Sequence, residues 1–242
     1  MRFYDLQTFS NMGTGEHNIA ELASMAERLG WTGIAIADNY DGQQKLAQLK
    51  LGIAAVQQQV KIDVVPAVTL RPNDVAELKK QLNEVRQSVP IVMVSGGDYN
   101  INRAACEDNR VDVIVHPELN RPDSGLDDIC LTMAAANGVA IGISFNTILR
   151  AARKARARAL AHIATNIELA AAFRVPIVVM SGGQSKWEIR DPRQLIALAS
   201  ILGAELPHAF AAASDVPVNI VEKNKKKLAG TLVGGVEVIG HA

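Results

Sequence analysis

The regular recurrence of short aliphatic runs along the chain most constrains its fold. Each run is rich in Val, Ile, Leu or Ala, ends in polar residues, and is separated from the next by a segment with helical periodicity. Strands that are apolar throughout are typical of parallel sheets covered on both faces. The runs are Arg2–Phe9, Gly33–Asp38, Lys61–Leu70, Pro90–Ser95, Val111–Val115, Val139–Phe145, Pro176–Ser181 and Phe210–Ser214.

The segments between these runs have the periodicity and the end signals of helices. Residues 19–29 place five apolar side chains on one face, and Gly30 is a normal helix stop. Asn73-Asp74, Asp123-Ser124 and Asp191-Pro192 are expected to begin helices as N-caps. Eight strands alternating with helices in 242 residues predict a single TIM-barrel-like (β/α)8 domain over residues 1–242. Periodicity leaves a doubly wound open sheet as the alternative.

One internal near-repeat favours a regular barrel. Pro90-Ile-Val-Met-Val-Ser-Gly-Gly97 recurs 86 residues later as Pro176-Ile-Val-Val-Met-Ser-Gly-Gly183, which is about three βα units. The glycines at both strand ends can offer backbone N–H groups to an anion, or they can simply turn the chain.

In a barrel, the carboxyl ends of the strands share one rim, where binding and catalytic groups gather. Of the five histidines only His116 follows a strand directly, and no two histidines stand at metal-ligand spacing. A hydrogen-bonding role is therefore favoured for His116. No GxSxG elbow, Walker loop or GxGxxG motif is present. The expected rim residues are Asp5, Gln7, Asp38, Asn39, Arg71, Ser95, His116, Glu118, Asn146, Ser181, Ser214 and Asp215.

The charge distribution points to a polyanionic partner. Lys plus Arg and Asp plus Glu are both 25, so the chain is not uniformly basic, yet no acidic residue lies between Asp128 and Glu168. Residues 150–158 carry five positive charges. On one continuous helix, four of them span an arc of about 140°, opposite Leu149, Ala152, Ala159, Leu160 and Ile163. Arginine-rich faces suit phosphate contacts, whereas a solvated surface is the alternative.

The remaining composition argues for a soluble cytoplasmic protein without a membrane partner. Cys106 and Cys130 form no CxxC motif, which suits a reducing compartment. The N-terminus has no signal-peptide apolar region, and no run reaches the roughly 18 apolar residues of a membrane span.

The first strand and the end of the second resemble the polymerase-and-histidinol-phosphatase metallohydrolase superfamily. That resemblance implies histidine ligands where this chain has Gln7, Phe9 and Asn39, and a further histidine where Ser214-Asp215-Val216-Pro217 has none. The scaffold matches and the metal centre does not. One functional hypothesis is still a metal-dependent phosphoesterase with an atypical ligand set of Asp5, Asp38, His116, Glu118 and Asp215.

Longer motifs resemble the archaeal thirty-kilodalton-type protein family of ribonuclease P, called component 3, almost end to end. They are residues 111–126, 137–141, 145–146, 176–183, 187–193 and 214–217, which include Val111-Asp-Val-Ile-Val-His116-Pro-Glu-Leu-Asn-Arg-Pro122. The resemblance implies a degenerate metallohydrolase barrel that binds and stabilises the catalytic RNA while it removes the 5′ leader from precursor tRNA.

The same resemblance implies the partners. The endoribonuclease chemistry would belong to RNA-bound Mg²⁺, with no cofactor held by this protein and no catalysis by the isolated chain. A small ferredoxin-like ribonuclease P subunit and other ribonuclease P proteins would be its protein partners. A pure assembly scaffold, docking an acidic protein through the basic segment, is a further hypothesis.

The predicted RNA contacts combine the family motif with charge geometry. His116 and Arg121 come from the motif, and the cations of residues 150–158 come from the predicted helix. The full set is Arg71, Arg103, Arg110, His116, Arg121, Arg150, Arg153, Lys154, Arg158 and Arg190.

Overall fold

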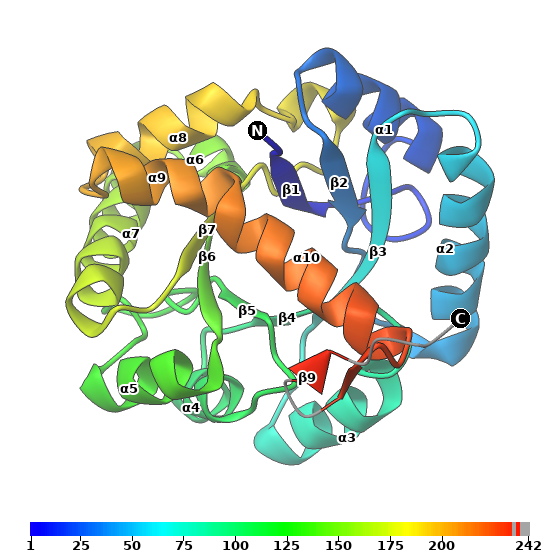
Figure 1. Ribbon diagram of the computed structural model, residues 1–242. Coiled ribbons are helices and arrows are strands. Elements are labelled where there is room, and N and C mark those ends of the chain that lie inside the picture. The colour runs from blue at the N-terminus through cyan, green and yellow to red at the C-terminus, as the bar shows by residue number, and fades with distance from the viewer. Residues whose placement is uncertain (234–235, 238–242) are drawn as a thin grey trace.

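The computed structural model describes residues 1–233 and 236–237. Seven parallel strands follow one another in chain order, curled into a barrel within a ring of helices (Figure 1). This confirms the TIM-barrel-like α/β fold, since a doubly wound sheet would reverse its strand order. The strands are β1 (Tyr4–Thr8), β2 (Gly33–Ile36), β3 (Asp63–Leu70), β4 (Ile91–Ser95), β5 (Val113–Val115), β6 (Ala140–Ser144) and β7 (Ile177–Met180), and β8 (Leu232–Val233) pairs with β9 (Val236–Glu237).

The barrel closes between β1 and the segment that follows β7. Phe9 N donates to Gly183 O at 2.9 Å, and Gly182 N donates to Gln7 O at 2.9 Å. The register of β1 against β2 shifts between Asp5 and Thr8. Such irregularities re-aim side chains near functional sites, and this one surrounds Gln7.

Helices cover the outside of the sheet. They are α1 (Ile19–Arg28), α2 (Gly42–Gln57), α3 (Val75–Val85), α4 (Tyr99–Glu107), α5 (Asp128–Asn137), α6 (Phe145–Arg150), α7 (Arg153–Phe173), the 3-10 turn η1 (Lys186–Glu188), α8 (Pro192–Ile201), α9 (Leu206–Ala213) and α10 (Asp215–Leu228). Within the described part of the chain, none of them has the length and apolarity that a membrane span requires.

Each strand divides its side chains between two apolar layers, because successive residues point to opposite faces. In β4, Ile91 and Met93 fill the barrel interior, whereas Val92 and Val94 pack outward against the helices. All four side chains are fully buried. This explains why the strands read as continuous apolar runs.

The eighth predicted strand, Phe210–Ser214, is wrong, because these residues belong to α9 and its C-terminal cap. The run contains three consecutive alanines, which are the best helix formers, and Pro207 sits in the first turn, where helices tolerate it. The alanine-rich run therefore has the apolar composition of a buried strand but forms a helix.

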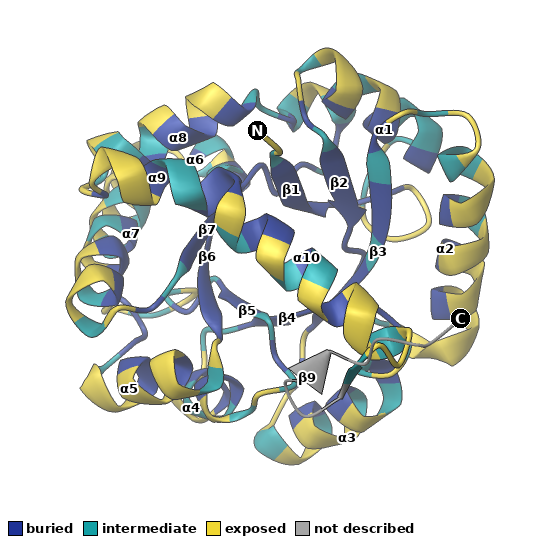
Figure 2. Ribbon diagram, in the orientation of Figure 1, coloured by how far each residue is buried: buried dark blue, intermediate teal, exposed yellow. Residues whose placement is uncertain are grey.

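Helix α10 closes one end of the barrel in place of an eighth strand. It crosses that opening diagonally (Figure 1), with buried residues toward the strands and exposed residues outward (Figure 2). Val218 and Val221 pack into the interior layer. We call this end, where the strands begin, the base, and the opposite end the rim.

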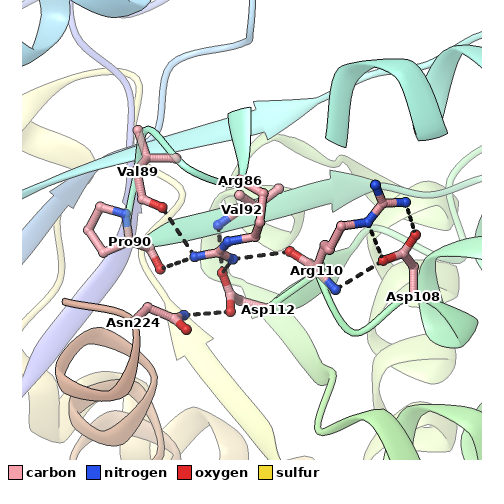
Figure 3. A network of polar contacts seen from close by, with 8 residues as sticks. All are labelled: Arg86, Val89, Pro90, Val92, Asp108, Arg110, Asp112 and Asn224. Carbon is pink, nitrogen blue, oxygen red and sulfur yellow. Dashed lines mark hydrogen bonds and ion pairs between the residues drawn. The ribbon is translucent and has the colours of Figure 1, made fainter. Parts of the chain in front are cut away.

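A buried charge network joins α10 to the base (Figure 3). Asp112, just before β5, accepts from Arg86 at 2.7 Å, from Asn224 of α10 at 2.6 Å, and from Val92 N at 2.8 Å. The Arg86 guanidinium also donates to three backbone carbonyls, those of Val89, Pro90 and Arg110. The single polar residue that interrupts the apolar run 111–115 is therefore structural.

The predicted helix through residues 150–158 is also wrong. Helix α6 ends at Arg150, and α7 begins at Arg153 after an extended Ala152, with Arg153 at a φ of 49°. The Arg156 guanidinium stabilises the interruption between α6 and α7. It donates to the carbonyls of Ile148, Leu149 and Ala151 at the end of α6. Those carbonyls have no partner within their helix, so arginine takes the place of a glycine stop.

Two of the three predicted N-caps are confirmed. Asp74 accepts from Glu77 N at the start of α3, and Asp191 forms a capping box with Gln194 at the start of α8. The prediction at Asp123-Ser124 is wrong, because Asp127 caps α5 instead.

Candidate functional site

The rim holds an open cavity of about 670 Å³, which we call the rim cavity. This volume lies in the range of small-molecule binding pockets. The ends of β4, β5 and β6 and the loops that follow them supply its walls. The lining residues used below are Phe9, Arg71, Ser95, His116, Glu118, Ser144, Asn146, Thr147, Arg150 and Gly182.

His116 occupies a strained position in this wall. Its φ of 54° is rare for a residue with a side chain, and its Nδ1 lies 3.1 Å from Thr147 Oγ1. Burial, with the nearby Arg71 charge, lowers the pKa of His116 to about 4. The imidazole is therefore neutral at pH 7, so it can form hydrogen bonds to a ligand but carries no charge that would neutralise an anion.

Two serine hydroxyls line the rim cavity without a hydrogen-bond partner in the described structure. Ser95 ends β4 and is 8% exposed, and Ser144 ends β6 and is 3% exposed. Ser144 was missed by the sequence analysis, although strand alternation places it on the interior face that Ala140 shares.

Gln7 lies beside this floor with its amide nitrogen and oxygen both buried and unpaired. A Cβ on Gly182 would lie 1.9 Å from Ser144 Oγ and 3.2 Å from Gln7 Oε1. Glycine at this position therefore lets Ser144 and Gln7 pack closely against the backbone. Each buried polar atom without a partner costs stability.

Two arginines line the rim cavity and are paired differently. Arg71 is exposed and has no partner among residues 1–233. Arg150 donates to Asn146 Oδ1 at 3.1 Å and forms an ion pair with Glu188 at 2.9 Å. Arg71 is thus the cation in this cavity that remains available to a ligand.

A second hollow of about 500 Å³ adjoins the rim cavity and shares Glu118 and Thr147 with it. Arg121 and Arg158 line this hollow. Arg121 is paired with Asp123 at 2.6 Å, whereas Arg158 is exposed and unpaired within the described chain.

The start of α7 projects its cations into solvent beside this hollow. Arg153, Lys154 and Arg158 are exposed and have no partner within the range that the structure covers. No side chain caps the helix, and no acidic residue lies in its first turn. Because the helix dipole is positive at this end, cations here are unfavourable by themselves and an anion is favoured.

The other predicted RNA contacts lie apart from this group. Arg103 forms an exposed pair with Glu107 on α4. Arg190 donates to the Trp187 and Ile189 carbonyls and lies 4.9 Å from the Phe145 ring centroid. Arg110 binds Asp108 and lines a cavity with Lys223 and Lys227 of α10, at the base.

The glycine-rich strand ends do not form the anion site that the repeat suggested. Gly96 N donates to Val115 O at 2.8 Å, Gly97 N to Asn102 Oδ1 at 3.0 Å, and Gly182 N to Gln7 O. Three of the four glycine N–H groups are therefore already used within the fold, which favours chain turning and close packing as the role of these glycines.

The predicted rim set is also divided. Asp38 and Asn39 line a separate cavity of about 180 Å³. Ser214 and Asp215 are not at the rim, because they begin α10, whose Asn224 and Lys225 bind residues at the starts of strands. Helix α10 replaced the strand that would have carried them to the rim.

The residues present do not fit the metal centre that the metallohydrolase resemblance of the sequence implies. Asp5 accepts from the backbone N–H groups of Gln7 and Ser181, and burial raises its pKa to about 6. Asp38 accepts from Ser10 N and Ser10 Oγ. Within the described residues, no group of three His, Cys, Asp or Glu side chains could share a metal ion.

Sequence comparison gives consistent matches over the length of the chain. The RNase P subunit p30 family pattern matches residues 2–229. Ribonuclease P protein component 3 of Methanosarcina mazei is 33% identical over 237 residues, covering 98% of this chain and 95% of that protein. The protein of the same name from Thermococcus kodakarensis is 37% identical over 156 residues, 64% of this chain and 68% of that one.

Two structural matches differ in what they show about the chain. A chain of the cryo-EM structure of archaeal ribonuclease P with mature tRNA is 27% identical, with a TM-score of 0.83 and 98% coverage of both chains. Histidinol phosphate phosphatase of Lactococcus lactis, solved with zinc, L-histidinol and phosphate, has a TM-score of 0.58 at 10% identity, covering 92% of this chain and 94% of that one. The second match shows the barrel alone.

Proposed function

The chain belongs to the RNase P subunit p30 family and is a protein subunit of ribonuclease P, and we propose that it acts by binding and stabilising the catalytic RNA. In this proposal the holoenzyme removes the 5′ leader from precursor tRNA, and the isolated chain is non-catalytic. Mg²⁺ is held by the RNA, and this protein holds no cofactor.

The start of α7 is the observation that carries the RNA-bracing proposal. Three exposed cations without partners, Arg153, Lys154 and Arg158, stand at a helix end whose dipole also favours an anion. Unpaired cations repel one another, so their placement favours a polyanionic ligand. Contacts of this type neutralise phosphates and release counterions without reading sequence.

The residues at the expected metal-ligand positions support a non-catalytic role for the protein. Gln7, Phe9 and Asn39 stand where the metallohydrolase resemblance implies histidines, and Asp5 and Asp38 are committed to internal hydrogen bonds. Among the described residues, the metal-dependent phosphoesterase alternative therefore has no ligand set to support it.

We further propose a small ferredoxin-like ribonuclease P subunit and other ribonuclease P proteins as protein partners, in the cytoplasm. Ile201 of α8, 82% exposed, and Leu206 of α9, 59% exposed, offer apolar surface to such a partner. Covering them would remove apolar surface from water, which favours association.

Reconstitution tests the RNA-bracing role. Precursor tRNA cleavage by the catalytic RNA and its small protein partner is measured against Mg²⁺ concentration, with this chain wild type or Arg153→Ala/Lys154→Ala/Arg158→Ala. The wild type is expected to lower the Mg²⁺ requirement, and the triple variant is expected to lose most of that effect. For the triple variant, the slope of log RNA affinity against log salt concentration should be smaller in magnitude by about 2 to 3, because each lost cation no longer neutralises one phosphate.

The matched control is Lys50→Ala/Lys61→Ala/Lys80→Ala, which removes three exposed positive charges elsewhere. It should behave as the wild type does. If the triple α7 variant also rescues fully, RNA binding lies elsewhere on the subunit. If the wild type gives no rescue and no RNA affinity, the bracing role itself is wrong.

A further inference from the structure

We propose that the rim cavity binds one unpaired ribonucleotide of an RNA strand, with the nucleoside inside and its phosphate at Arg71. This proposal rests on RNA being the ligand of the chain, and it names the part of RNA that a second site takes. It assigns a binding role to a cavity whose former metal ligands are lost.

The distribution of polar groups selects a nucleoside over a bare anion. The inner part of the rim cavity offers neutral hydrogen-bonding groups, namely the Ser95 and Ser144 hydroxyls and the neutral His116. Glu118 adds a carboxyl to the wall of the cavity. A carboxyl in the wall disfavours a free phosphate, whereas ribose hydroxyls can donate to it.

The Gln7 amide lies behind the Gly182 wall of the rim cavity. Its nitrogen and oxygen are buried and lack partners. A Cβ on Gly182 would lie 1.9 Å from Ser144 Oγ and 3.2 Å from Gln7 Oε1, so these three residues are closely packed. The Gln7 amide is therefore placed to report on a ligand in the cavity rather than to contact it.

The remaining wall matches the other parts of a nucleotide. Phe9, which is 5% exposed, gives the rim cavity an apolar surface against which a base can pack. Arg71 is exposed and unpaired within the described residues, as a phosphate contact must be. A paired base must first be unstacked and flipped out of its duplex to enter a cavity, whereas an unpaired nucleotide enters without that free-energy cost.

The adjoining hollow offers a path for the RNA strand beyond the bound nucleotide. Glu118 and Thr147 line both spaces, and Arg158 of α7 lines only the second. A strand with one nucleotide in the rim cavity can therefore place its neighbouring phosphate near α7. This arrangement connects the nucleotide site to the phosphate contacts proposed above.

The test titrates the isotope-labelled full chain with adenosine 5′-monophosphate and uridine 5′-monophosphate, observed by amide NMR. Ribose 5-phosphate, inorganic phosphate and the 2′-deoxy nucleotides are the comparison probes. We expect nucleotides to bind more tightly than ribose 5-phosphate or phosphate and to shift the Gln7 side-chain amide and the Gly182 N–H. Ser95→Ala/Ser144→Ala should weaken nucleotide binding about 10-fold, because two hydrogen bonds are lost.

Controls separate binding from folding. Ser88→Ala/Ser200→Ala removes two hydroxyls outside the rim cavity and should leave affinity unchanged, and Ser95→Leu should block the site while thermal unfolding shows a folded chain. Equal binding of inorganic phosphate and nucleotides overturns the proposal, as do absent binding, an unaffected double variant, or shifts confined to α7.

Failure of this inference differs from failure of the bracing role. If ribonuclease P RNA binds and depends on the α7 cations, while the serine variant changes neither RNA nor nucleotide affinity, only the nucleotide site is wrong. If nucleotides bind in the rim cavity but ribonuclease P RNA does not bind the chain, the bracing role fails and the cavity assignment stands.

Discussion

The two ends of the barrel treat buried polar groups in opposite ways. At the base, both carboxylate oxygens of Asp112 are hydrogen-bonded, and the Arg86 guanidinium reaches three carbonyls besides. At the rim, the Gln7 amide and the hydroxyls of Ser95 and Ser144 have no partner within the described chain. The paired groups at the base hold the fold. At the rim the buried Gln7 amide is retained at a cost in stability, and the two serine hydroxyls face the rim cavity, where a ligand can reach them.

The difference between the two ends also explains why some of the ten predicted RNA contacts are already paired within the protein and others are not. Arg110 lies at the base and is bound to Asp108, so its charge is already used. Arg71 and the α7 cations lie on or beside the rim without partners. Position in the barrel, rather than the presence of an arginine, decides which cations remain available.

The largest expected effect is at the base. Asp112→Ala leaves Arg86 without its carboxylate partner in a site where the side chains are 14% and 11% exposed. Removing one partner of such a pair should lower the free energy of unfolding by about 3 to 5 kcal/mol, measured by urea denaturation. Asp123→Ala, which breaks the Arg121 pair with Asp123 57% exposed, should cost less than about 1 kcal/mol. Similar losses in both variants would remove the distinction between the ends.

The next effect concerns pH at the rim. The pKa of His116 is about 4 in the folded chain, below its unfolded value of about 6.5. A histidine held neutral stabilises the fold above pH 6.5, and this contribution is lost as pH falls toward 4. The difference in unfolding free energy between wild type and His116→Gln should therefore fall by about 3 kcal/mol from pH 7 to pH 4. A pH-independent difference would show that the imidazole is solvated.

The smallest effect has the opposite sign. Gln7→Met replaces a buried, unpaired amide by an apolar side chain of similar shape, and it should raise the free energy of unfolding by about 1 to 2 kcal/mol. Gln57→Met is the matched control, because that amide donates to Ile62 O and accepts from Val64 N, and it should be destabilising. If Gln7→Met also destabilises the chain, the Gln7 amide has a partner, and the proposed difference between the rim and the base is wrong.

Much of the scaffold was predictable from local patterns. Seven of the expected strands are present, because short runs rich in β-branched residues and flanked by polar residues favour buried strands. Two of the errors have local causes. Phe210–Ser214 lacks β-branched residues, and Ala151-Ala152 contains no glycine or proline that would signal the break between α6 and α7.

The candidate site was only partly predictable. Alternation along strands brought Arg71, Ser95, His116 and Asn146 to one cavity, as expected. Spacing could not show that Asp38 lines a different cavity, nor that the Ser-Gly-Gly N–H groups are used within the fold. Those outcomes depend on hydrogen bonds between segments far apart in the chain.

The sequence by itself determined the alternation of strands with helices and the cation-rich segment, since these follow from apolar periodicity and from charge, which are local properties. The order of the strands, which distinguishes a barrel from a doubly wound sheet, is seen in the tertiary structure. Only the tertiary structure decided which polar groups have partners. The base pairs Asp112 with Arg86 and Asn224 from distant elements, whereas the rim brings Gln7, Ser144 and Gly182 together without pairing the first two. The availability of a hydrogen-bonding group is a property of its neighbours in space, and those neighbours exist only after the chain has folded.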